Sequence, residues 1–276
     1  MSFDGVEIFM VAAIQVTATP RVADNLAAAG RLIAEAAQQG AKLVALPEYF
    51  CLMGLRDGDK VAVREDFGSG PIQDFLAATA AKEKVWIVGG TLPLDCGSAD
   101  KVRNASLVFD ASGECVARYD KIHLFGFATE TERYDESRSL EPGSDIVTLE
   151  TPFGKLGLSI CYDLRFPELY RAMGEVDLIL IPSAFTETTG RAHWDLLVRA
   201  RAVENLCYVL APAQGGHHEN GRDTFGNSLI VDPWGKVLAR LDKDPGVAIA
   251  EIDRVRIAEL RKSLPALAHR TLRTVR

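Results

Sequence analysis

The sequence lacks the features that mark secreted, disulfide-rich or membrane-spanning proteins. Its five cysteines are an odd number, are widely spaced and include no CxxC pair, so neither a disulfide framework nor a structural zinc site is expected. The apolar segment of residues 6–16 is interrupted by Glu7 and is too short to span a bilayer. Asp4 stands where an export signal would carry positive charge. These absences predict a cytoplasmic protein without a membrane partner.

The chain also lacks an excess of positive charge. It has 31 basic and 38 acidic residues and a net charge of −7 at pH 7, which disfavours nucleic acid as a partner. The basic stretch 254–262 lies in an amphipathic helical pattern with acidic neighbours, which is typical of a solvated helix face. The glycine-rich segments have neither GxGxxG nor GxxxxGKS/T spacing, so no phosphate-binding loop is proposed.

What is present is an ordinary globular composition, with 47% hydrophobic and 25% charged residues. A length of 276 residues allows one large domain or two small ones. No Ser-, Pro- or Gly-rich linker divides the chain. The sequence therefore predicts a single domain over 1–276, with a core of about 10–253 and a C-terminal helix and tail at 254–276.

Short apolar segments alternate with helical patterns in both halves of the chain. Strands are predicted at residues 10–16, 42–46, 85–88, 156–160, 178–181 and 208–211. Helices are predicted from Asp24 to Gly40, from Pro71, from Pro167 and over 192–205. Hairpins are predicted within 105–119, 147–160 and 228–241. This βαβ alternation, joined by hairpins, suggests two sheets packed face to face with helices outside, although periodicity alone establishes only a mixed α/β class.

Cys161 is the best-placed candidate for a catalytic residue. It follows a strand that we expect to be buried and precedes a helix that Pro167 can start. Backbone N–H groups at such a turn would lower the pKa of the thiol and favour the thiolate, which is the nucleophilic form. Most unpaired cysteines are inert core residues, and the local sequence leaves that alternative open.

Two more polar residues are candidates for catalysis. Glu48 comes directly after a buried strand, where its apolar neighbours would raise the pKa of its carboxyl and let it act as a general base. Lys121 ends the first hairpin, and its ammonium could hold the negative oxygen of a tetrahedral intermediate. Either residue could instead be an ordinary surface charge.

The histidines offer an alternative partner for a cysteine nucleophile. His123 and His193 lie in the more structured segments, so a Cys–His enzyme is the main rival on the residues alone. The sequence His217-His218-Glu219 looks like a metal cluster, but adjacent side chains project apart and the segment is rich in glycine. No metal site is predicted there.

Three motifs taken together resemble the nitrilase, or carbon–nitrogen hydrolase, superfamily. They are LPE at 46–48, YDKIHL at 119–124 and SICYDLRFPELYR at 159–171, in the order of the family's Glu, Lys and Cys motifs. Further matching segments are SAFTETTGRAHW at 183–194, RARAVEN at 199–205 and FGNSLIVDPWG at 225–235. The resemblance therefore covers nearly the whole chain, from about residue 10 to residue 253.

Within that superfamily, the CYDxRFPE form and the GxAHW stretch resemble the branch of omega-amidases and deaminated glutathione amidases. Nitrile-cleaving members carry a tryptophan and a glutamate after the cysteine, and these are absent. The loop 215–228 is more similar to the deaminated glutathione amidases. Arg191 stands where these amidases usually have proline, and its charge could alter which acidic substrate is preferred.

The resemblance implies a four-layer α-β-β-α sandwich that pairs into homodimers, or higher homo-oligomers, through helices near the nucleophile. It also implies catalysis by Glu48, Lys121 and Cys161, with Glu136 as a second glutamate that orients Lys121 or Glu48. The Tyr162 backbone N–H would help Lys121 to hold the oxyanion. No cofactor is expected, because a thiolate and an amide can form an acyl thioester unaided.

The expected reaction is hydrolysis of a small amide that carries a carboxylate, such as deaminated glutathione or a 2-oxo-dicarboxylate omega-amide, with release of ammonia. Tyr49, Arg165 and Arg191 are the unranked candidates for binding the acidic part of the substrate. Two alternatives remain: an N-carbamoyl amino acid amidohydrolase with the same catalytic residues, and a catalytically silent interaction protein on the same fold.

Overall fold

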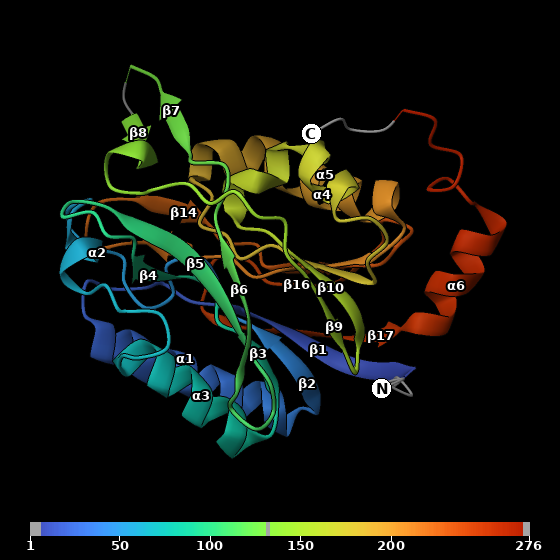
Figure 1. The fold of residues 1–276 in the computed structure, drawn as a ribbon, viewed down its shortest axis with the longest axis horizontal. Coiled ribbons are helices and arrows are strands. Elements are labelled where there is room, and N and C mark those ends of the chain that lie inside the picture. The colour runs from blue at the N-terminus through green and yellow to red at the C-terminus, as the bar shows by residue number, and fades with distance from the viewer. Residues whose placement is uncertain (1–6, 131–132, 273–276) are drawn as a thin grey trace.

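Two mixed β-sheets lie face to face between helices in the computed structural model, which describes residues 7–130 and 133–272 (Figure 1). Helices α1 and α3 cover the outer face of the first sheet, and α4 and α5 cover the outer face of the second (Figure 1). The expected four-layer α-β-β-α sandwich is therefore confirmed. The helices are α1 (Val22–Gln38), α2 (Asp59–Ala62), α3 (Pro71–Glu83), α4 (Pro167–Ala172), α5 (Glu187–Asn205) and α6 (Arg254–Ser263).

The first sheet has the strand order β17-β1-β2-β3-β5-β4, and β6 also pairs with β5. Its strands are β1 (Ile8–Gln15), β2 (Ala41–Ala45), β3 (Trp86–Val88), β4 (Leu92–Asp95), β5 (Val102–Phe109), β6 (Cys115–Asp120) and β17 (Gly246–Asp253). Strands β1, β2 and β3 are parallel, whereas β17 runs antiparallel to β1 over all eight residues of each strand. The C-terminal part of the chain thus closes one edge of the sheet that the N-terminal part builds.

The second sheet has the strand order β16-β15-β12-β11-β10-β9. Its strands are β9 (Thr148–Thr151), β10 (Gly154–Leu158), β11 (Leu178–Leu180), β12 (Tyr208–Ala211), β15 (Leu229–Val231) and β16 (Val237–Arg240). Strands β10, β11 and β12 are parallel, and hairpins add the antiparallel neighbours on both sides. Parallel strands at the centre of both sheets bring their carboxyl ends together, and such ends are where α/β proteins place their sites.

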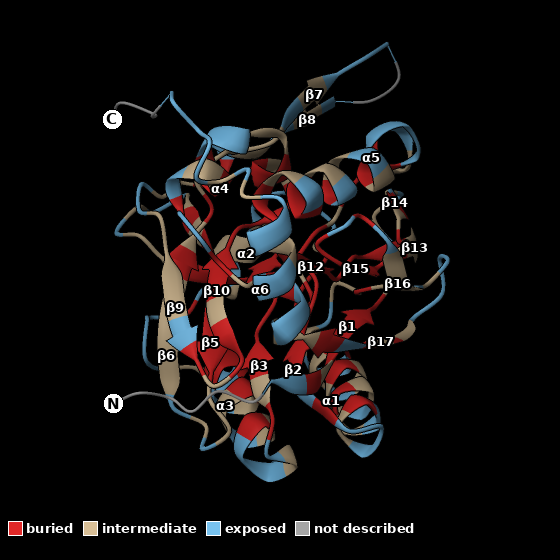
Figure 2. Ribbon diagram, turned by 90° about the vertical axis from the view of Figure 1, so that its right-hand side faces the viewer, coloured by how far each residue is buried: buried red, intermediate tan, exposed pale blue. Residues whose placement is uncertain are grey.

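Strand β1 shows how the sequence specifies the layers. Val11 and Ala13 belong to the core between the two sheets, and Ala12 and Ile14 belong to the core beneath α1 and α3. Successive side chains of a strand point to opposite faces, so a strand that is apolar throughout is buried on both. The burial colouring shows the same arrangement, with buried residues on the strands and on the inward faces of α1, α3 and α5 (Figure 2).

Helix α5 begins at Glu187, five residues before the predicted start at residue 192. The Thr186 side chain accepts a hydrogen bond from the Thr189 backbone N–H, which is the geometry of a helix N-cap. The capping threonine is followed by residues without an apolar pattern, so periodicity alone placed the start too late. The earlier start matters because it places Thr186 beside Cys161, where both line the same cavity.

Two small hairpins were not predicted, and both lie near the ends of the central strands. One pairs β7 (Gly126–Ala128) with β8 (Arg133–Asp135) and projects from the body of the molecule (Figures 1 and 2). The other pairs β13 (Gly215–His217) with β14 (Asp223–Phe225). Within the described residues, no helix combines the length and the apolar character needed to cross a membrane.

Candidate active site

Glu48 lies just beyond the end of β2, on a backbone held in an uncommon conformation. The next residue, Tyr49, has φ of 58°, and its N–H donates to Thr91 Oγ1 over 2.9 Å. Gly90 makes room for this turn, because a Cβ at that position would lie 2.2 Å from the Pro47 carbonyl oxygen. A non-glycine residue at positive φ carries strain, and such strain is concentrated at functional sites.

Cys161 begins a short 3-10 turn, Cys161–Arg165, after the end of β10. Its backbone also has a positive φ, 48°, and its N–H donates to the Pro182 carbonyl over 2.9 Å. Asp163 fixes the turn from within: it is completely buried and accepts hydrogen bonds from the N–H of Ile160 and the hydroxyl of Tyr119. The nucleophile candidate is therefore held on a rigid support.

Lys121 follows β6 and is completely buried, with its ammonium between two glutamates. Its Nζ lies 2.8 Å from Oε1 of Glu48 and 2.8 Å from Oε2 of Glu136. Asn104 on β5 donates from Nδ2 to the same Oε1 of Glu48 over 2.9 Å. The structure thus brings together residues that lie far apart in the sequence.

Glu136 follows β8 and reaches the site from the base of the projecting hairpin. Its carboxylate accepts from Lys121, from the Tyr49 hydroxyl over 2.8 Å and from the Phe125 N–H over 2.7 Å. Its own N–H donates to the Phe125 carbonyl over 2.9 Å. Although sequence periodicity did not define this region, the carboxylate is held by several groups at once.

The two glutamates that share Lys121 have opposite pKa shifts. Burial raises the pKa of Glu48 above its ordinary value, and the charge of Lys121 opposes that rise only in part. Burial also acts to raise the pKa of Glu136, but the charge and hydrogen bonds of Lys121 outweigh it and lower the pKa. Burial would lower the pKa of Lys121, yet the two carboxylates raise it. Glu136 therefore stays ionised beside a charged lysine, whereas Glu48 is the carboxyl suited to exchange a proton.

The Cys161 thiol does not have the lowered pKa that its position at a turn predicts. Burial raises the pKa of this thiol well above its ordinary value, and the negative charge of Glu48 raises it further, while Lys121 opposes both effects. The prediction of a stabilised thiolate is therefore wrong, because desolvation exceeds any effect of nearby N–H groups. The thiol and the Glu48 carboxyl line the same cavity, and the effect of Glu48 on the pKa of the thiol shows that the thiol proton has a base near it.

Of the three predicted substrate-binding residues, the structure brings two to the site. Tyr49 lines the cavity that contains Glu48 and Cys161, and Arg165 lines an adjoining one beside Cys161 and Phe185. Arg191 is not brought there: its side chain is 75% exposed on α5 and pairs with Glu187. It lies on the first turns of a helix that begins earlier than predicted.

The histidines do not form a Cys–His pair. His123 Nδ1 lies 2.7 Å from Asp163 Oδ1, and its ring stacks on Phe166. His193 Nδ1 lies 3.3 Å from the Arg165 guanidinium. In the described part of the chain, neither histidine lines the cavities that contain Cys161.

The adjacent residues His217, His218 and Glu219 contact four different residues. His217 lies 2.9 Å from Asp223, His218 contacts the Ala18 carbonyl and Thr224, and Glu219 pairs with Arg21. Their side chains diverge, as the adjacency of these residues predicts.

Three residues at the site were missed by the sequence reasoning. Asn104 lies within a predicted hairpin strand, where nothing distinguishes it from a surface amide. Lys60 and Arg222 line the cavities next to Glu136. The loop of Arg222 was considered in the sequence for its histidine pair and for its resemblance to one amidase branch. The positive charge of Arg222 was the available signal for a binding role.

Comparison with known proteins agrees with this geometry. The sequence model described as carbon–nitrogen hydrolase matches residues 10–262. A deaminated glutathione amidase from Synechocystis sp. is 41% identical over 268 residues, covering 95% of this chain and 98% of the relative. The human deaminated glutathione amidase is 37% identical, and the match covers 98% of this chain and 84% of the human protein. A crystal structure of a Saccharomyces cerevisiae protein from branch 10 of the nitrilase superfamily superposes with a TM-score of 0.85 at 32% identity. The superposition covers 94% of this chain and 95% of the yeast chain.

Proposed function

Because the chain belongs to the carbon–nitrogen hydrolase family and is an amidase, we propose that Cys161, Glu48 and Lys121 hydrolyse the amide through a thioester. The observation that carries this proposal is that Cys161 and Glu48 line one cavity, with the Glu48 carboxylate 2.8 Å from Lys121. A nucleophile, a base and a fixed cation are thereby within reach of one reacting carbon.

In the first step, the Cys161 sulfur attacks the amide carbonyl carbon while Glu48 takes the thiol proton. A C–S bond forms, and the carbonyl electron pair moves onto oxygen. The Lys121 ammonium and the Tyr162 N–H stabilise that oxyanion. The Tyr162 N–H is suited to this role because the first N–H groups of a helical turn have no partner within the turn.

In the second step, Glu48 returns its proton to the amide nitrogen, and the C–N bond breaks. Ammonia or an amine leaves, and a thioester remains on Cys161. Glu48 then takes a proton from water as the water attacks the thioester carbonyl. The C–S bond breaks, the thiol regains its proton from Glu48, and the carboxylic acid is released.

Glu136 acts on Lys121 rather than on the substrate. Its ionised carboxylate lies 3.0 and 2.8 Å from Nζ of Lys121, and Tyr49 and the Phe125 N–H fix it in place. A fixed anion keeps the lysine charged and aimed at the site. Glu136 is therefore a positioning residue.

The substrate we propose is a small amide that carries a carboxylate. Its support is the name of the relatives, deaminated glutathione amidase, over nearly the whole chain. Deaminated glutathione is the first compound to test. An N-carbamoyl amino acid is the alternative, because the same three residues would cleave it.

Product release from a panel of amides tests this proposal. The purified chain is given deaminated glutathione, succinamate, its uncharged counterpart butyramide, N-carbamoylalanine and butyronitrile, with Cys161→Ala as the matched control. We expect the acidic amides to have the highest kcat/KM and the control to be inactive. Preference for the carbamoyl compound would establish the alternative, and equal release by the control would contradict Cys161 as the nucleophile.

We further propose a cytoplasmic homodimer. The five cysteines are unpaired, which suits a reducing compartment.

The proposed dimer rests on exposed apolar side chains. Leu196 and Val203, seven residues apart on α5, are exposed together with Trp234 on the neighbouring hairpin turn. Light scattering should give twice the chain mass for the wild type and the single chain mass for Leu196→Glu; a monomeric wild type would contradict the dimer.

A further inference from the structure

Lys60 and Arg222 line the cavities beside the catalytic glutamates without a carboxylate partner of their own. Arg56 and Arg133 line parts of the same cavities, but both are exposed. Lys60 lies on α2 and Arg222 lies in the turn between β13 and β14, and both are partly buried. Among the described residues, no carboxylate oxygen comes within 4.0 Å of either side-chain cation. Many other arginines of this acidic chain, such as Arg118 and Arg201, form such pairs.

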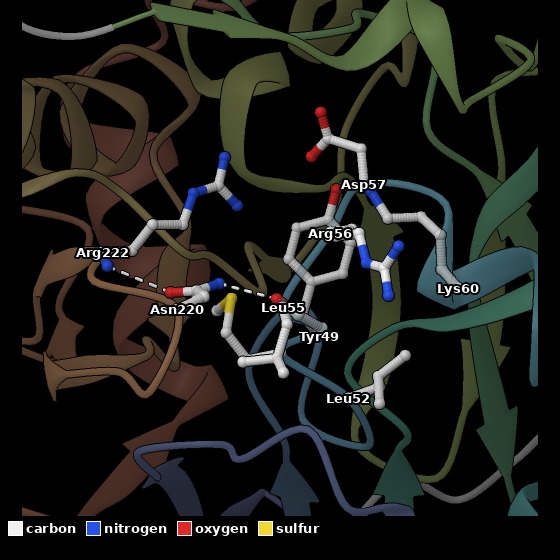
Figure 3. Close-up of a pocket in the computed structure, with 10 residues that line it drawn as sticks. Tyr49, Leu52, Leu55, Arg56, Asp57, Lys60, Asn220 and Arg222 are labelled. Atoms are coloured by element: carbon white, nitrogen blue, oxygen red, sulfur yellow. Dashed lines mark hydrogen bonds between the residues drawn. The ribbon is translucent and has the colours of Figure 1, made fainter.

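Aromatic rings, rather than acids, hold the two cations. The Lys60 Nζ lies 5.1 Å from the centre of the Tyr49 ring, and the Arg222 guanidinium lies 4.6 Å from the centre of the Tyr134 ring. Figure 3 shows Lys60 and Arg222 on opposite sides of Tyr49, with the carboxylate of Asp57 turned away from Lys60. Ring faces orient a cation but do not occupy its hydrogen-bond donors. Lys60 donates a hydrogen bond to the Ser139 hydroxyl over 3.4 Å.

The space between the two cations continues into the catalytic cavity. Tyr49 and Arg222 line the cavity that contains Lys60, and they also line the cavity that contains Glu48 and Cys161. Tyr49 lies between these two cavities, and its side chain is fixed there by the hydrogen bond that its hydroxyl donates to Glu136. A small substrate held at Cys161 would therefore extend toward Arg222 and Lys60.

We infer that Arg222 and Lys60 form the subsite that binds the carboxylate of the substrate, an inference that rests on the proposed amidase function. The planar guanidinium of Arg222 can bind a carboxylate through two hydrogen bonds, and the Lys60 ammonium adds a second charge. A chain with a net charge of −7 repels anions at long range, so local cations must supply the attraction. Arg191 does not contribute, because it lies outside these cavities.

Burial is what gives this subsite its selectivity. Burial lowers the pKa of Lys60, while the charges of Glu136 and Asp57 oppose the shift, so an anion bound beside the ammonium would stabilise its charged form. A neutral amide would leave both cations unpaired. Hydrogen bonds to charged groups at such a site correspond to roughly a 10- to 100-fold preference.

A role in charge balance is the competing explanation, because the charge of Lys60 also helps to keep Glu136 ionised. Loss of charge balance would lower the turnover of every amide to a similar extent. Loss of a carboxylate subsite changes the ratio between acidic and neutral amides, mainly through KM.

The test measures kcat and KM for two matched pairs of amides with the full chain. Succinamate and butyramide differ by a carboxylate on the acyl part, and N-butyrylglycine and N-propylbutyramide differ by a carboxylate on the amine part. We expect Arg222→Gln and Lys60→Gln each to reduce the acidic-to-neutral ratio of kcat/KM about 10- to 100-fold in at least one pair. Arg222→Lys and Lys60→Arg should restore most of the ratio, and Arg191→Gln should keep the wild-type ratio.

An unchanged ratio in both pairs, or an equal loss for acidic and neutral amides, would overturn the subsite. If the wild type hydrolyses no amide, the proposed function fails separately, and calorimetry still tests the subsite. Succinate should bind to Cys161→Ala and bind at least tenfold more weakly when Arg222→Gln is added. Equal binding by folded proteins, checked by their thermal unfolding, would overturn the inference.

Discussion

Lys121 Nζ lies 2.8 Å from Oε1 of Glu48, and both side chains are almost completely buried. A buried ion pair of this kind would normally lower the pKa of its carboxyl. Here the lysine is shared with Glu136, which takes most of the stabilisation, and the pKa of Glu48 remains raised. One lysine thus separates two glutamates into a fixed anion and a proton acceptor, and the predictions below follow from that asymmetry.

Replacement of the base should stop the reaction, whereas replacement of the nearby histidines should not. We expect Glu48→Gln to lower kcat by roughly 10²- to 10⁴-fold, because glutamine cannot accept the thiol proton. His193→Ala removes a ring that contacts Arg165 rather than Cys161 and should keep most of the turnover. Steady-state kinetics decides between them: an active Glu48→Gln with an inactive His193→Ala would restore the Cys–His alternative.

The acid limb of the pH profile should report Glu48. Hydrolysis needs its ionised form, so activity falls as pH drops through a pKa that burial has raised, and the loss begins above the ordinary glutamate range. Asn104 donates to the ionised carboxylate, so Asn104→Leu should raise that pKa and move the acid limb of kcat/KM to higher pH.

Ser106→Ala is the matched control for this shift. Ser106 lies two residues along β5, and its buried hydroxyl has no hydrogen-bond partner among the residues that the structure describes. Its removal should leave the acid limb in place. An acid limb that moves equally in both variants would mean that a different group titrates.

Asp163 should matter for stability through the turn that carries Cys161. It accepts hydrogen bonds from Tyr119, Ile160 and the backbone N–H of His123. Asp163→Asn removes a buried charge from these donors and should lower the free energy of unfolding by about 3 kcal/mol. Tyr119→Phe removes one donor and should cost about half as much. Denaturant unfolding measures both, and an Asp163→Asn protein as stable as the wild type would contradict this role.

The other cysteines should be dispensable for chemistry. Cys96 and Cys115 are partly exposed and lie outside the cavities that contain Cys161. We expect Cys96→Ser and Cys115→Ser to keep wild-type kcat, and Cys161→Ala to lose on the order of 10⁴-fold or more. A similar loss in either serine variant would place chemistry elsewhere.

The layers of the fold and the meeting of Glu48, Lys121 and Cys161 were predictable from sequence. Apolar segments such as β2 and β10 are buried. A polar residue just after such a strand lies at the carboxyl-end edge of the sheet, where α/β proteins place their sites. Strand β17 was not predicted, because its pairing with β1 joins segments more than 230 residues apart.

Electrostatic properties were harder to predict than positions. The sign of the Cys161 pKa shift depends on how completely the fold excludes water from the thiol. The residues next to Cys161 in the sequence do not determine this degree of burial. The roles of Lys60 and Arg222 were also not predictable, because these residues differ from surface cations only in the cavities and aromatic rings that surround them in the fold. Arg191 shows the converse: its unusual identity in a family motif suggested a role, but the earlier start of α5 leaves it exposed.

The thioester on Cys161 is the central claim, and mass spectrometry after acid quenching tests it most directly. The wild type is mixed with succinamate, quenched during turnover and digested, and the peptides are searched for a succinyl group. The account predicts that group on Cys161, and formation of succinhydroxamate when hydroxylamine competes with water. A succinyl group on another residue, or hydrolysis with neither adduct nor hydroxamate, would contradict it.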